Sequence, residues 1–175
     1  MKPLRDYIHL IPDFPGPGIL FRDITGILDS GAGFRLCIDE LCDRLKGVDF
    51  DLVAGIESRG FLFGAPLADR FRKAFVPVRK KGKLPRQTIS QTYHLEYGDA
   101  TIEIHADAVK PGQKVVLIDD LLATGGTMDA ACSLIERLGG EVAKVLFVVE
   151  LEGFEARKTK LAGRPVDTLL SYPGK

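Results

Sequence analysis

Residues 115–127 read Val-Val-Leu-Ile-Asp-Asp-Leu-Leu-Ala-Thr-Gly-Gly-Thr, and this stretch decides which class of fold we expect. It starts with a continuous apolar run, 115–118, which is typical of a strand that is buried on both faces. Two carboxylates, Asp119 and Asp120, end the run, and a loop and a helical pattern over 126–138 follow. In an open α/β sheet, ligands bind at this kind of junction, beyond the carboxyl end of a strand.

The loop after the carboxylates is made of small residues, namely Ala123, Thr124, Gly125, Gly126 and Thr127. Such a loop can surround a phosphate with backbone N–H groups, and the dipole of the following helix favours the negative charge. The two carboxylates do not suit the same phosphate, but they accept hydrogen bonds from sugar hydroxyls. The junction therefore predicts a site for a phosphorylated sugar. It has neither the lysine of a Walker A loop nor the G-x-G-x-x-G of a dinucleotide site.

The rest of the chain alternates between strand and helix patterns. We expect strands at 51–56, 74–79 and 142–149, helices at 36–45 and 61–71, and a hairpin at 93–96 and 101–105. This alternation predicts an α/β fold with a mostly parallel central sheet flanked by helices. Residues 80–92 are basic and show little periodicity, so we expect a long loop that is either an active-site lid or a surface insertion.

The composition limits the classes of function. Lys plus Arg and Asp plus Glu number 24 each, which argues against nonspecific binding to nucleic acid or anionic membranes. The three cysteines lack C-x-x-C spacing, which favours reduced thiols in a cytoplasmic protein. The three histidines form no metal-ligand pattern, so we expect no metal site built by the protein alone. We also expect no signal peptide and no membrane span.

Residues 119–128 resemble the motif with which type I phosphoribosyltransferases bind phosphoribosyl diphosphate (PRPP). Further segments at 12–15, 18–24, 57–64, 79–85 and 95–98 are similar, in the same order, to one branch of that family, the adenine phosphoribosyltransferases. The resemblance implies the type I phosphoribosyltransferase fold as a single domain over 1–175. It implies a small base-binding hood within 1–34, a flexible lid loop and hairpin within 80–100, and a homodimer.

The activity that the resemblance implies is a step of purine salvage. The 5-phosphoribosyl group of PRPP is transferred to adenine, which gives AMP and diphosphate, and Mg²⁺ is carried with PRPP. The transition state of such a transfer resembles an oxocarbenium ion. The expected partners are therefore adenine and PRPP, with neither nucleic acid nor a membrane.

The resemblance assigns the PRPP site to three groups of residues. The loop 123–127 would hold the 5′-phosphate, and Asp119 and Asp120 would accept from the ribose hydroxyls. Cations suit phosphate oxygens, and those expected at the diphosphate are Arg59, Arg79 and Lys83. Arg59 would also act in catalysis. Lys80 and Lys81 are weaker candidates, because a run of charges is usually a solvated face.

The resemblance assigns the purine to a second group of residues. Phe21 would stack on the flat base, and Leu20, Arg22 and Leu151 would complete the adenine pocket. Glu96 is the candidate for proton transfer at the purine, because a carboxylate under a closed lid has a raised pKa. The choice of adenine follows from the resemblance and not from the spacing of these side chains.

Three other functions stay open at this point. A transferase of the same family could use a 6-oxopurine or xanthine, although the segments at 12–15 and 21–24 argue against it. A regulator could sense PRPP without catalysis, but the chain has no DNA-binding extension and keeps both Glu96 and the basic loop. A stand-alone sugar-phosphate binding module would not need the lid.

Overall fold

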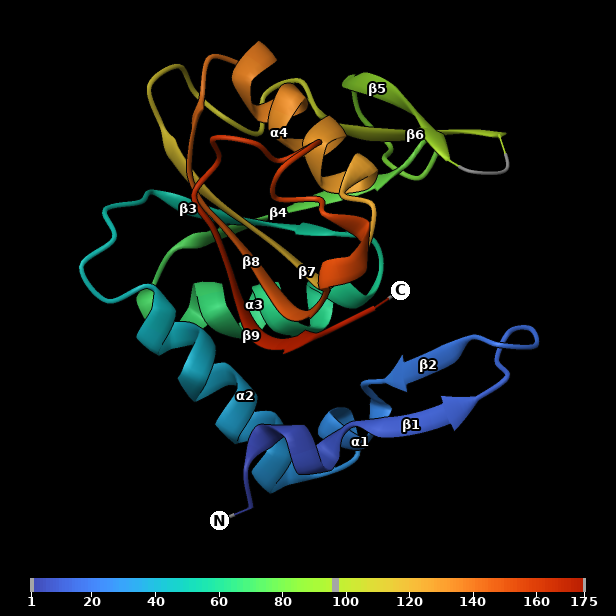
Figure 1. Ribbon diagram of the computed structural model, residues 1–175. Coiled ribbons are helices and arrows are strands. Elements are labelled where there is room, and N and C mark those ends of the chain that lie inside the picture. The colour runs from blue at the N-terminus through green and yellow to red at the C-terminus, as the bar shows by residue number, and fades with distance from the viewer. Residues whose placement is uncertain (1, 96–97, 175) are drawn as a thin grey trace.

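The computed structural model describes residues 2–95 and 98–174, and its centre is a seven-stranded sheet between two layers of helices (Figure 1). The strand order is β5-β6-β4-β3-β7-β8-β9. The strands are β3 (Leu52–Ile56), β4 (Ala74–Lys80), β5 (Thr88–Leu95), β6 (Gly98–His105), β7 (Lys114–Leu122), β8 (Glu141–Leu151) and β9 (Val166–Tyr172). The helices are α1 (Thr25–Leu28), α2 (Gly31–Arg44), α3 (Arg59–Phe71) and α4 (Gly126–Arg137), with 3-10 helices at Leu4–Tyr7 and Glu152–Phe154.

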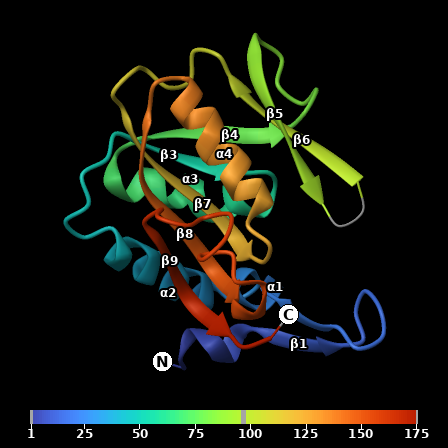
Figure 2. The same ribbon diagram turned by 45° about the horizontal axis from the view of Figure 1, so that its top comes forward.

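The sheet is mostly parallel, as its sequence pattern predicts. Strands β4, β3, β7, β8 and β9 pair in parallel, whereas β6 pairs antiparallel with both β4 and β5. Helix α4 covers one face of the parallel part, and α2 and α3 cover the other, which both views show (Figures 1 and 2). The fold class expected from the sequence is therefore confirmed.

The apolar run 115–118 is buried on both faces, as expected. Val115 and Leu117 belong to the core under α4, and Val116 and Ile118 belong to the core under α2 and α3. Successive side chains of a strand point to opposite faces, so an uninterrupted apolar run supplies both cores at once. This run holds β7 in the middle of the sheet and fixes where its carboxyl end lies.

Several predicted boundaries are wrong. The loop expected over 80–92 is shorter, because β5 begins at Thr88 and pairs with β6 from Thr88↔His105 onward. The hairpin is largely polar, so its strand pattern is weak in the sequence. Helix α3 begins at Arg59 rather than at residue 61, and β7 continues to Leu122 rather than ending at residue 118. Strand β9 had no counterpart among the expected elements.

The N-terminal region forms a separate hairpin of β1 (His9–Pro12) and β2 (Leu20–Asp23), which pair antiparallel. Figure 1 shows this hairpin, drawn in blue, projecting from the body of the molecule. Its exposed side chains include Leu10 and Phe14, which are 52% and 51% exposed. The chain turns at Asp13 and Gly18, both with positive φ. No helix in the described part of the chain is long and apolar enough to cross a bilayer.

Candidate active site

Three adjoining cavities lie around the end of β7, and we name each by its lining. The apolar cavity, of about 370 Å³, is lined by Ile11, Phe14, Phe21, Arg22, Asp23, Ile24, Thr25, Arg59, Asp120 and Leu121. The charged cavity, of about 280 Å³, is lined by Glu57, Ser58, Arg59, Lys80, Asp119 and Asp120. The loop cavity, of about 90 Å³, is lined by Asp119, Leu121, Leu122, Phe147 and residues 123–128. Shared residues join the three into one continuous site.

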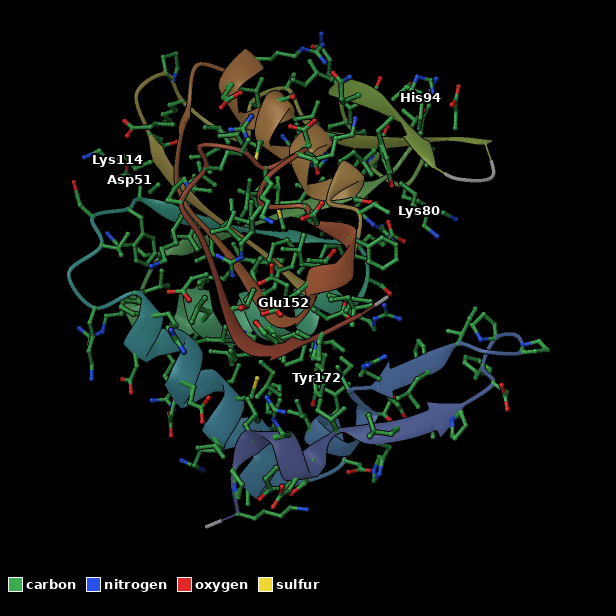
Figure 3. The ribbon with its side chains drawn as sticks, viewed as in Figure 1. Asp51, Lys80, His94, Lys114, Glu152 and Tyr172 are labelled. Carbon is green, nitrogen blue, oxygen red and sulfur yellow. The ribbon has the colours of Figure 1, made fainter. Side chains whose placement is uncertain are left out.

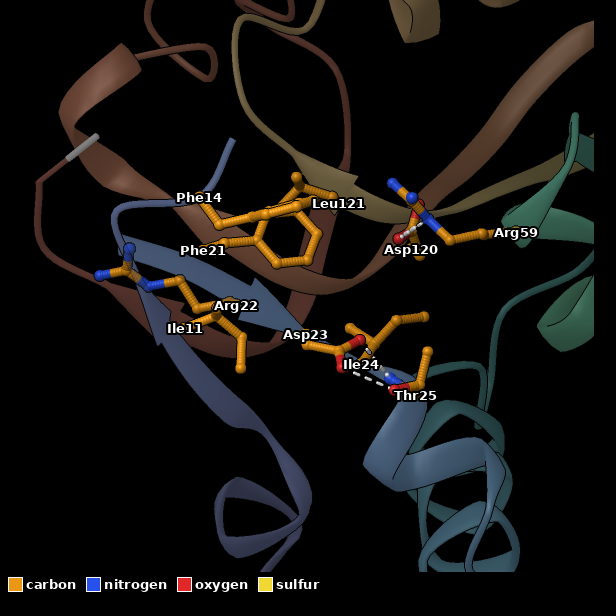
Figure 4. Close-up of a pocket in the computed structure, with 10 residues that line it drawn as sticks. All are labelled: Ile11, Phe14, Phe21, Arg22, Asp23, Ile24, Thr25, Arg59, Asp120 and Leu121. Atoms are coloured by element: carbon orange, nitrogen blue, oxygen red, sulfur yellow. Dashed lines mark hydrogen bonds and ion pairs between the residues drawn. The ribbon is translucent and has the colours of Figure 1, made fainter. Parts of the chain in front are cut away.

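The apolar cavity lies between the N-terminal hairpin and the end of β7 (Figure 4). Phe14 and Phe21 meet edge to face, with ring centroids 5.2 Å apart, and Leu121 approaches from β7. Such rings give a flat aromatic ligand a surface on which to stack. The Arg22 guanidinium lies 5.1 Å from the centre of the Tyr172 ring, so this side chain is engaged by β9.

Two residues expected at the adenine pocket lie elsewhere. Leu20 sits at the start of β2 and is 37% exposed, and Leu151 pairs with Tyr172 at the end of β8. Both are described residues outside the lining of the apolar cavity. Phe21 and Arg22 do line it, and Ile11, Phe14 and Leu121 are lining residues that the sequence reasoning missed. Ile11 and Phe14 are large apolar side chains exposed on the N-terminal hairpin, and Leu121 lies on β7; none of these placements can be read from the sequence.

The charged cavity lies where α3 begins beside the end of β4. Arg59 is the first residue of α3, so the N-terminal end of that helix faces the cavity and favours an anion there. Lys80 closes the cavity from the last position of β4 (Figure 3 labels it). The Glu57–Ser58 peptide bond, which precedes Arg59, is cis.

Arg79 is a described residue outside the lining of this cavity, and it binds Glu57, which does line it. Its Nε and Nη2 atoms donate to the two Glu57 carboxylate oxygens over 3.1 and 3.2 Å, and Nη1 donates to the carbonyl of Lys83 over 3.0 Å. Burial raises the pKa of Glu57, but the hydrogen bonds from Arg79 and from the Lys80 backbone outweigh it, so this pKa is lowered. Consecutive strand residues point to opposite sides, which explains why Lys80 lines the cavity and Arg79 does not.

The two carboxylates lie within β7 and not beyond it, which corrects the expected strand end. Pairing of β7 with β3 stops at Gly55↔Ile118, whereas pairing with β8 continues to Leu122. One edge of β7 is therefore free where Asp119 and Asp120 lie, and both side chains line the charged cavity. Burial, and then the charge of Asp120, raises the pKa of Asp119 well above its ordinary value.

A glycine allows α3 to approach these carboxylates closely. A Cβ atom on Gly60 would lie 2.7 Å from the carbonyl oxygen of Ile118 and 3.2 Å from Asp119 Oδ1. Any larger residue would push the start of α3 away from β7. Arg59 is held in turn by Asp120, because its Nε atom donates to Asp120 Oδ2 over 2.5 Å.

The loop cavity is formed by the loop 123–127 together with the start of α4. Gly125 precedes the helix with a φ of 81°, a conformation that side chains with a Cβ rarely adopt. The arrangement leaves the first N–H groups of α4 free for an anion. All five loop residues expected at a phosphate line this small cavity.

The β5–β6 hairpin passes close to the same helix end. A Cβ atom on Gly126 would lie 3.5 Å from Tyr93 Cδ2 and 3.7 Å from the carbonyl oxygen of His94. Figure 3 labels His94 on this hairpin. Glu96, the candidate for proton transfer, lies outside the described residues. Lys83 is a described residue outside the lining of the charged cavity. Its backbone carbonyl accepts a hydrogen bond from Arg79.

In the part of the chain that the structure describes, no group of three or more His, Cys, Asp or Glu side chains is placed to hold a metal ion. The oxygen donors of the charged cavity are the carboxylates of Glu57, Asp119 and Asp120. These are the donor type that Mg²⁺ accepts, usually alongside phosphate oxygens of a substrate.

An anion loop at a helix end, paired carboxylates and an adjoining apolar cavity define the class of protein. The model of the phosphoribosyl transferase domain family matches residues 27–165, which include β7, its loop and α4. The site and the fold are therefore those of a phosphoribosyltransferase.

Curated relatives narrow this class. An adenine phosphoribosyltransferase from Agathobacter rectalis is 59% identical over 175 residues and covers 100% of both chains. One from Butyrivibrio fibrisolvens is 63% identical over 158 residues, or 90% of this chain and 88% of its own. The chain belongs to the adenine phosphoribosyltransferase family.

Solved structures agree with this membership. The crystal structure of adenine phosphoribosyltransferase from Thermoanaerobacter pseudethanolicus has a TM-score of 0.93 at 51% identity, over 97% of this chain and 98% of that one. The Saccharomyces cerevisiae enzyme, complexed with an imino-altritol bisphosphate and adenine, has a TM-score of 0.91 at 41% identity, over 95% and 96% of the two chains.

Proposed function

We propose that the protein transfers the 5-phosphoribosyl group of PRPP to adenine and releases AMP and diphosphate. The observation that carries the proposal is the joining of the three cavities through Arg59, Asp119 and Asp120. A flat apolar site, a charged site and an anion loop meet at two carboxylates. This arrangement matches a ribose that carries the base or the diphosphate at its anomeric carbon, hydroxyls at C2 and C3, and a phosphate at C5.

The loop cavity takes the 5′-phosphate in this proposal. Backbone N–H groups of residues 123–127 and the two threonine hydroxyls donate to the phosphate oxygens. Asp119 and Asp120 accept from the 2′ and 3′ hydroxyls, and Asp120 exchanges its contact with Arg59 for these donors. Their negative charge also stabilises the positive charge that develops on the sugar.

The charged cavity takes the diphosphate. Arg59 and Lys80 contact its oxygens, with the N-terminal end of α3 adding a favourable dipole. Arg79 and Lys83 add positive charge from outside the cavity lining. Arg79 also donates hydrogen bonds to both carboxylate oxygens of Glu57. Mg²⁺ carried with PRPP would supply positive charge to the leaving diphosphate. Asp119 and Asp120, which line the same cavity, are the side chains that could share in its coordination.

The apolar cavity takes adenine, with Phe21 and Phe14 against the ring and the backbone of β2 at its edge. N9 of the purine bonds to the anomeric carbon as the bond from that carbon to the diphosphate oxygen breaks. The proton of the purine must leave in the same sequence, and Glu96 is our candidate to accept or position it. The support for adenine as the base is the family membership and the adenine found in the yeast relative.

A base-competition assay tests the proposal. The purified protein is given PRPP, Mg²⁺ and equal amounts of adenine, hypoxanthine, guanine and xanthine, and the nucleotides are separated. We expect AMP alone. Formation of IMP, GMP or XMP would overturn the purine assignment, and PRPP binding without any nucleotide would favour a regulator.

We also propose a homodimer in the cytoplasm. The three free cysteines, Cys37, Cys42 and Cys132, are compatible with a reducing compartment. Large apolar side chains exposed on the N-terminal hairpin and Leu62 on α3, which is 44% exposed, offer apolar surface for a second copy. Light scattering coupled to size exclusion should give twice the chain mass, and a mass of one chain would contradict the dimer.

A further inference from the structure

An ion pair between buried Glu150 and half-exposed Arg157 lies behind the loop cavity, outside the site described above. Glu150, 6% exposed, is near the end of β8, where it pairs with Leu122 of β7. Arg157 Nε donates to the two Glu150 oxygens over 2.8 and 2.9 Å, and its Nη2 donates to Oε2 over 2.6 Å. The Thr168 hydroxyl completes the group with a hydrogen bond to Glu150 Oε2 over 3.2 Å.

The same arginine fastens a loop to the sheet. Arg157 Nη1 donates to the carbonyl of Val166 over 2.6 Å, so this side chain binds both β8 and β9. It belongs to residues 155–161, which we call the backing segment. Ala156 and Leu161 of this segment are 3% and 1% exposed and pack in the core beneath α4. The arginine and these two apolar residues together hold the segment in one position.

The backing segment packs directly against the phosphate loop. A Cβ atom on Gly125 would lie 3.1 Å from Ala156 Cβ, 3.4 Å from Lys160 Cβ and 3.5 Å from Leu161 Cγ. Gly125 has a positive φ and precedes α4, so its conformation aims the N–H groups of the loop. The position of the backing segment therefore sets how far the loop can move away from a bound phosphate.

Stability alone is a weak reason for this ion pair. Desolvation of the buried Glu150 carboxylate offsets much of its attraction to Arg157, and solvent around the 39% exposed arginine screens the rest. A bidentate arginine pair, in contrast, fixes direction as well as distance. The pair lies directly behind the phosphate loop, so its fixed geometry can hold the backing segment in one position against that loop.

We propose that Arg157, oriented by Glu150, is a positioning residue that holds the backing segment behind Gly125 and so shapes the 5′-phosphate subsite. The inference rests on the proposed function of the loop cavity. The inference goes beyond the proposed function because Arg157 and Glu150 touch no substrate in that proposal.

The test compares ligands that use different parts of the site. In Arg157→Met, which keeps an unbranched stem and removes the guanidinium, we expect binding of ribose 5-phosphate to weaken about tenfold, the scale seen when a residue that orients a binding group is lost. The KM for PRPP should rise by a similar factor, also about tenfold. Binding of diphosphate, and the KM for adenine, should stay within about twofold, because neither uses the loop cavity.

Two further variants separate positioning from stability. Arg164→Met removes two ion pairs of the same region, from Arg164 to Glu136 Oε1 at 2.6 Å and to Asp129 Oδ1 at 3.8 Å, both on α4. It should leave ribose 5-phosphate binding unchanged. Glu150→Gln keeps the shape of the side chain and removes its charge. It should also weaken ribose 5-phosphate binding and leave diphosphate binding unchanged. This variant decides the question if Arg157→Met does not fold.

Unchanged ribose 5-phosphate affinity in folded Arg157→Met and Glu150→Gln would overturn the inference, and so would equal losses for ribose 5-phosphate and diphosphate. The result stays distinct from failure of the proposed function. If the unaltered protein binds ribose 5-phosphate but makes no nucleotide, the activity is wrong, and the binding comparison still decides the role of Arg157.

Discussion

Arg59 Nε donates to Asp120 Oδ2 over 2.5 Å, and this contact stands at the boundary between the apolar and the charged cavity. The Asp120 side chain is 6% exposed and that of Arg59 is 50% exposed, so the arginine is the partner that can move. In the proposed mode of binding, a ribose that donates hydroxyl hydrogen bonds to Asp120 competes with Arg59 for the same oxygen, and the freed arginine faces the diphosphate. The proposal therefore couples substrate binding to the release of this cation through one carboxylate.

Replacing Asp120 tests that coupling. In Asp120→Ala we expect kcat/KM for PRPP to fall about 10- to 100-fold, because a hydrogen bond to a charged group contributes about 1.5–3 kcal/mol. The fold should persist, since half-exposed Arg59 can bind water instead. Steady-state kinetics and thermal unfolding measure the two effects. Unchanged KM and kcat would remove Asp120 from the site.

Lys80 and Lys81 form a matched pair for the charged cavity. Lys80 lines it, whereas Lys81 is exposed beyond the end of β4. In Lys80→Met we expect inhibition by diphosphate to weaken about tenfold, because a charge-assisted contact is lost, while Lys81→Met changes it less than about twofold. Inhibition constants at fixed salt measure this. Equal effects of the two variants would mean that only the net charge of the segment matters.

The sequence allowed the centre of the fold to be predicted because its strands carry unambiguous patterns. The run 115–118 has no polar residue, so burial on both faces was the natural interpretation, and the small residues of 123–127 marked the loop. Strand β9 and the β1–β2 hairpin mix polar and apolar residues over short lengths, so packing rather than local preference decides their structure.

The candidate site was harder to predict where it depends on register. Arg79 and Lys80 are neighbours of similar charge, and a shift of one residue exchanges which of them faces the cavity. Only the pairing of β4 with β3 and β6 decides it. The apolar cavity likewise needs two segments that are far apart in the chain, with Phe21 and Leu121 on opposite sides.

Phe21 and Phe34 separate a binding role from a core role. Phe21 lines the apolar cavity, whereas Phe34 packs in the core, with its ring centroid 6.2 Å from that of Phe63. In Phe21→Leu we expect the KM for adenine to rise about 2- to 12-fold, because a stacked ring contributes about 0.5–1.5 kcal/mol beyond its area. Phe34→Leu should lower the unfolding temperature and leave that KM unchanged. The reverse pattern would move the base out of this cavity.

Glu103 makes stability depend on pH through the loop 81–87. Its Oε1 accepts from the N–H groups of Lys83 and Leu84 over 3.0 and 2.9 Å. Burial raises the pKa of Glu103, but hydrogen bonds from the backbone of Leu84, Gly82 and Lys83 outweigh it, so the folded-state pKa is lowered. A lowered carboxyl pKa stabilises the fold above its unfolded value of about 4.3, and this contribution is lost as the pH falls through the folded value.

The variant Glu103→Gln should therefore be less stable than the unaltered protein at pH 7, by about 1–3 kcal/mol. The difference should begin to shrink as the pH falls below about 4.3, where the unfolded chain takes up its proton, and should be lost once the pH falls through the lower folded-state pKa. Urea unfolding at a series of pH values measures it. If the difference in unfolding free energy between the two proteins stays constant down to acid pH, the charge of Glu103 does not contribute to its hydrogen bonds with the backbone.

Glu96 is the residue whose role the sequence predicts and whose surroundings lie outside the described residues. If it accepts the purine proton, Glu96→Gln should lower kcat about 10²- to 10⁴-fold, because the amide cannot take that proton, while PRPP affinity changes little. Asp99→Asn is the matched control, since Asp99 lies on the same hairpin and binds His94 over 2.5 Å. It should leave kcat within about twofold. Equal losses of kcat and of PRPP affinity in Glu96→Gln would make this residue a substrate-binding group, with proton transfer left to water or to another side chain.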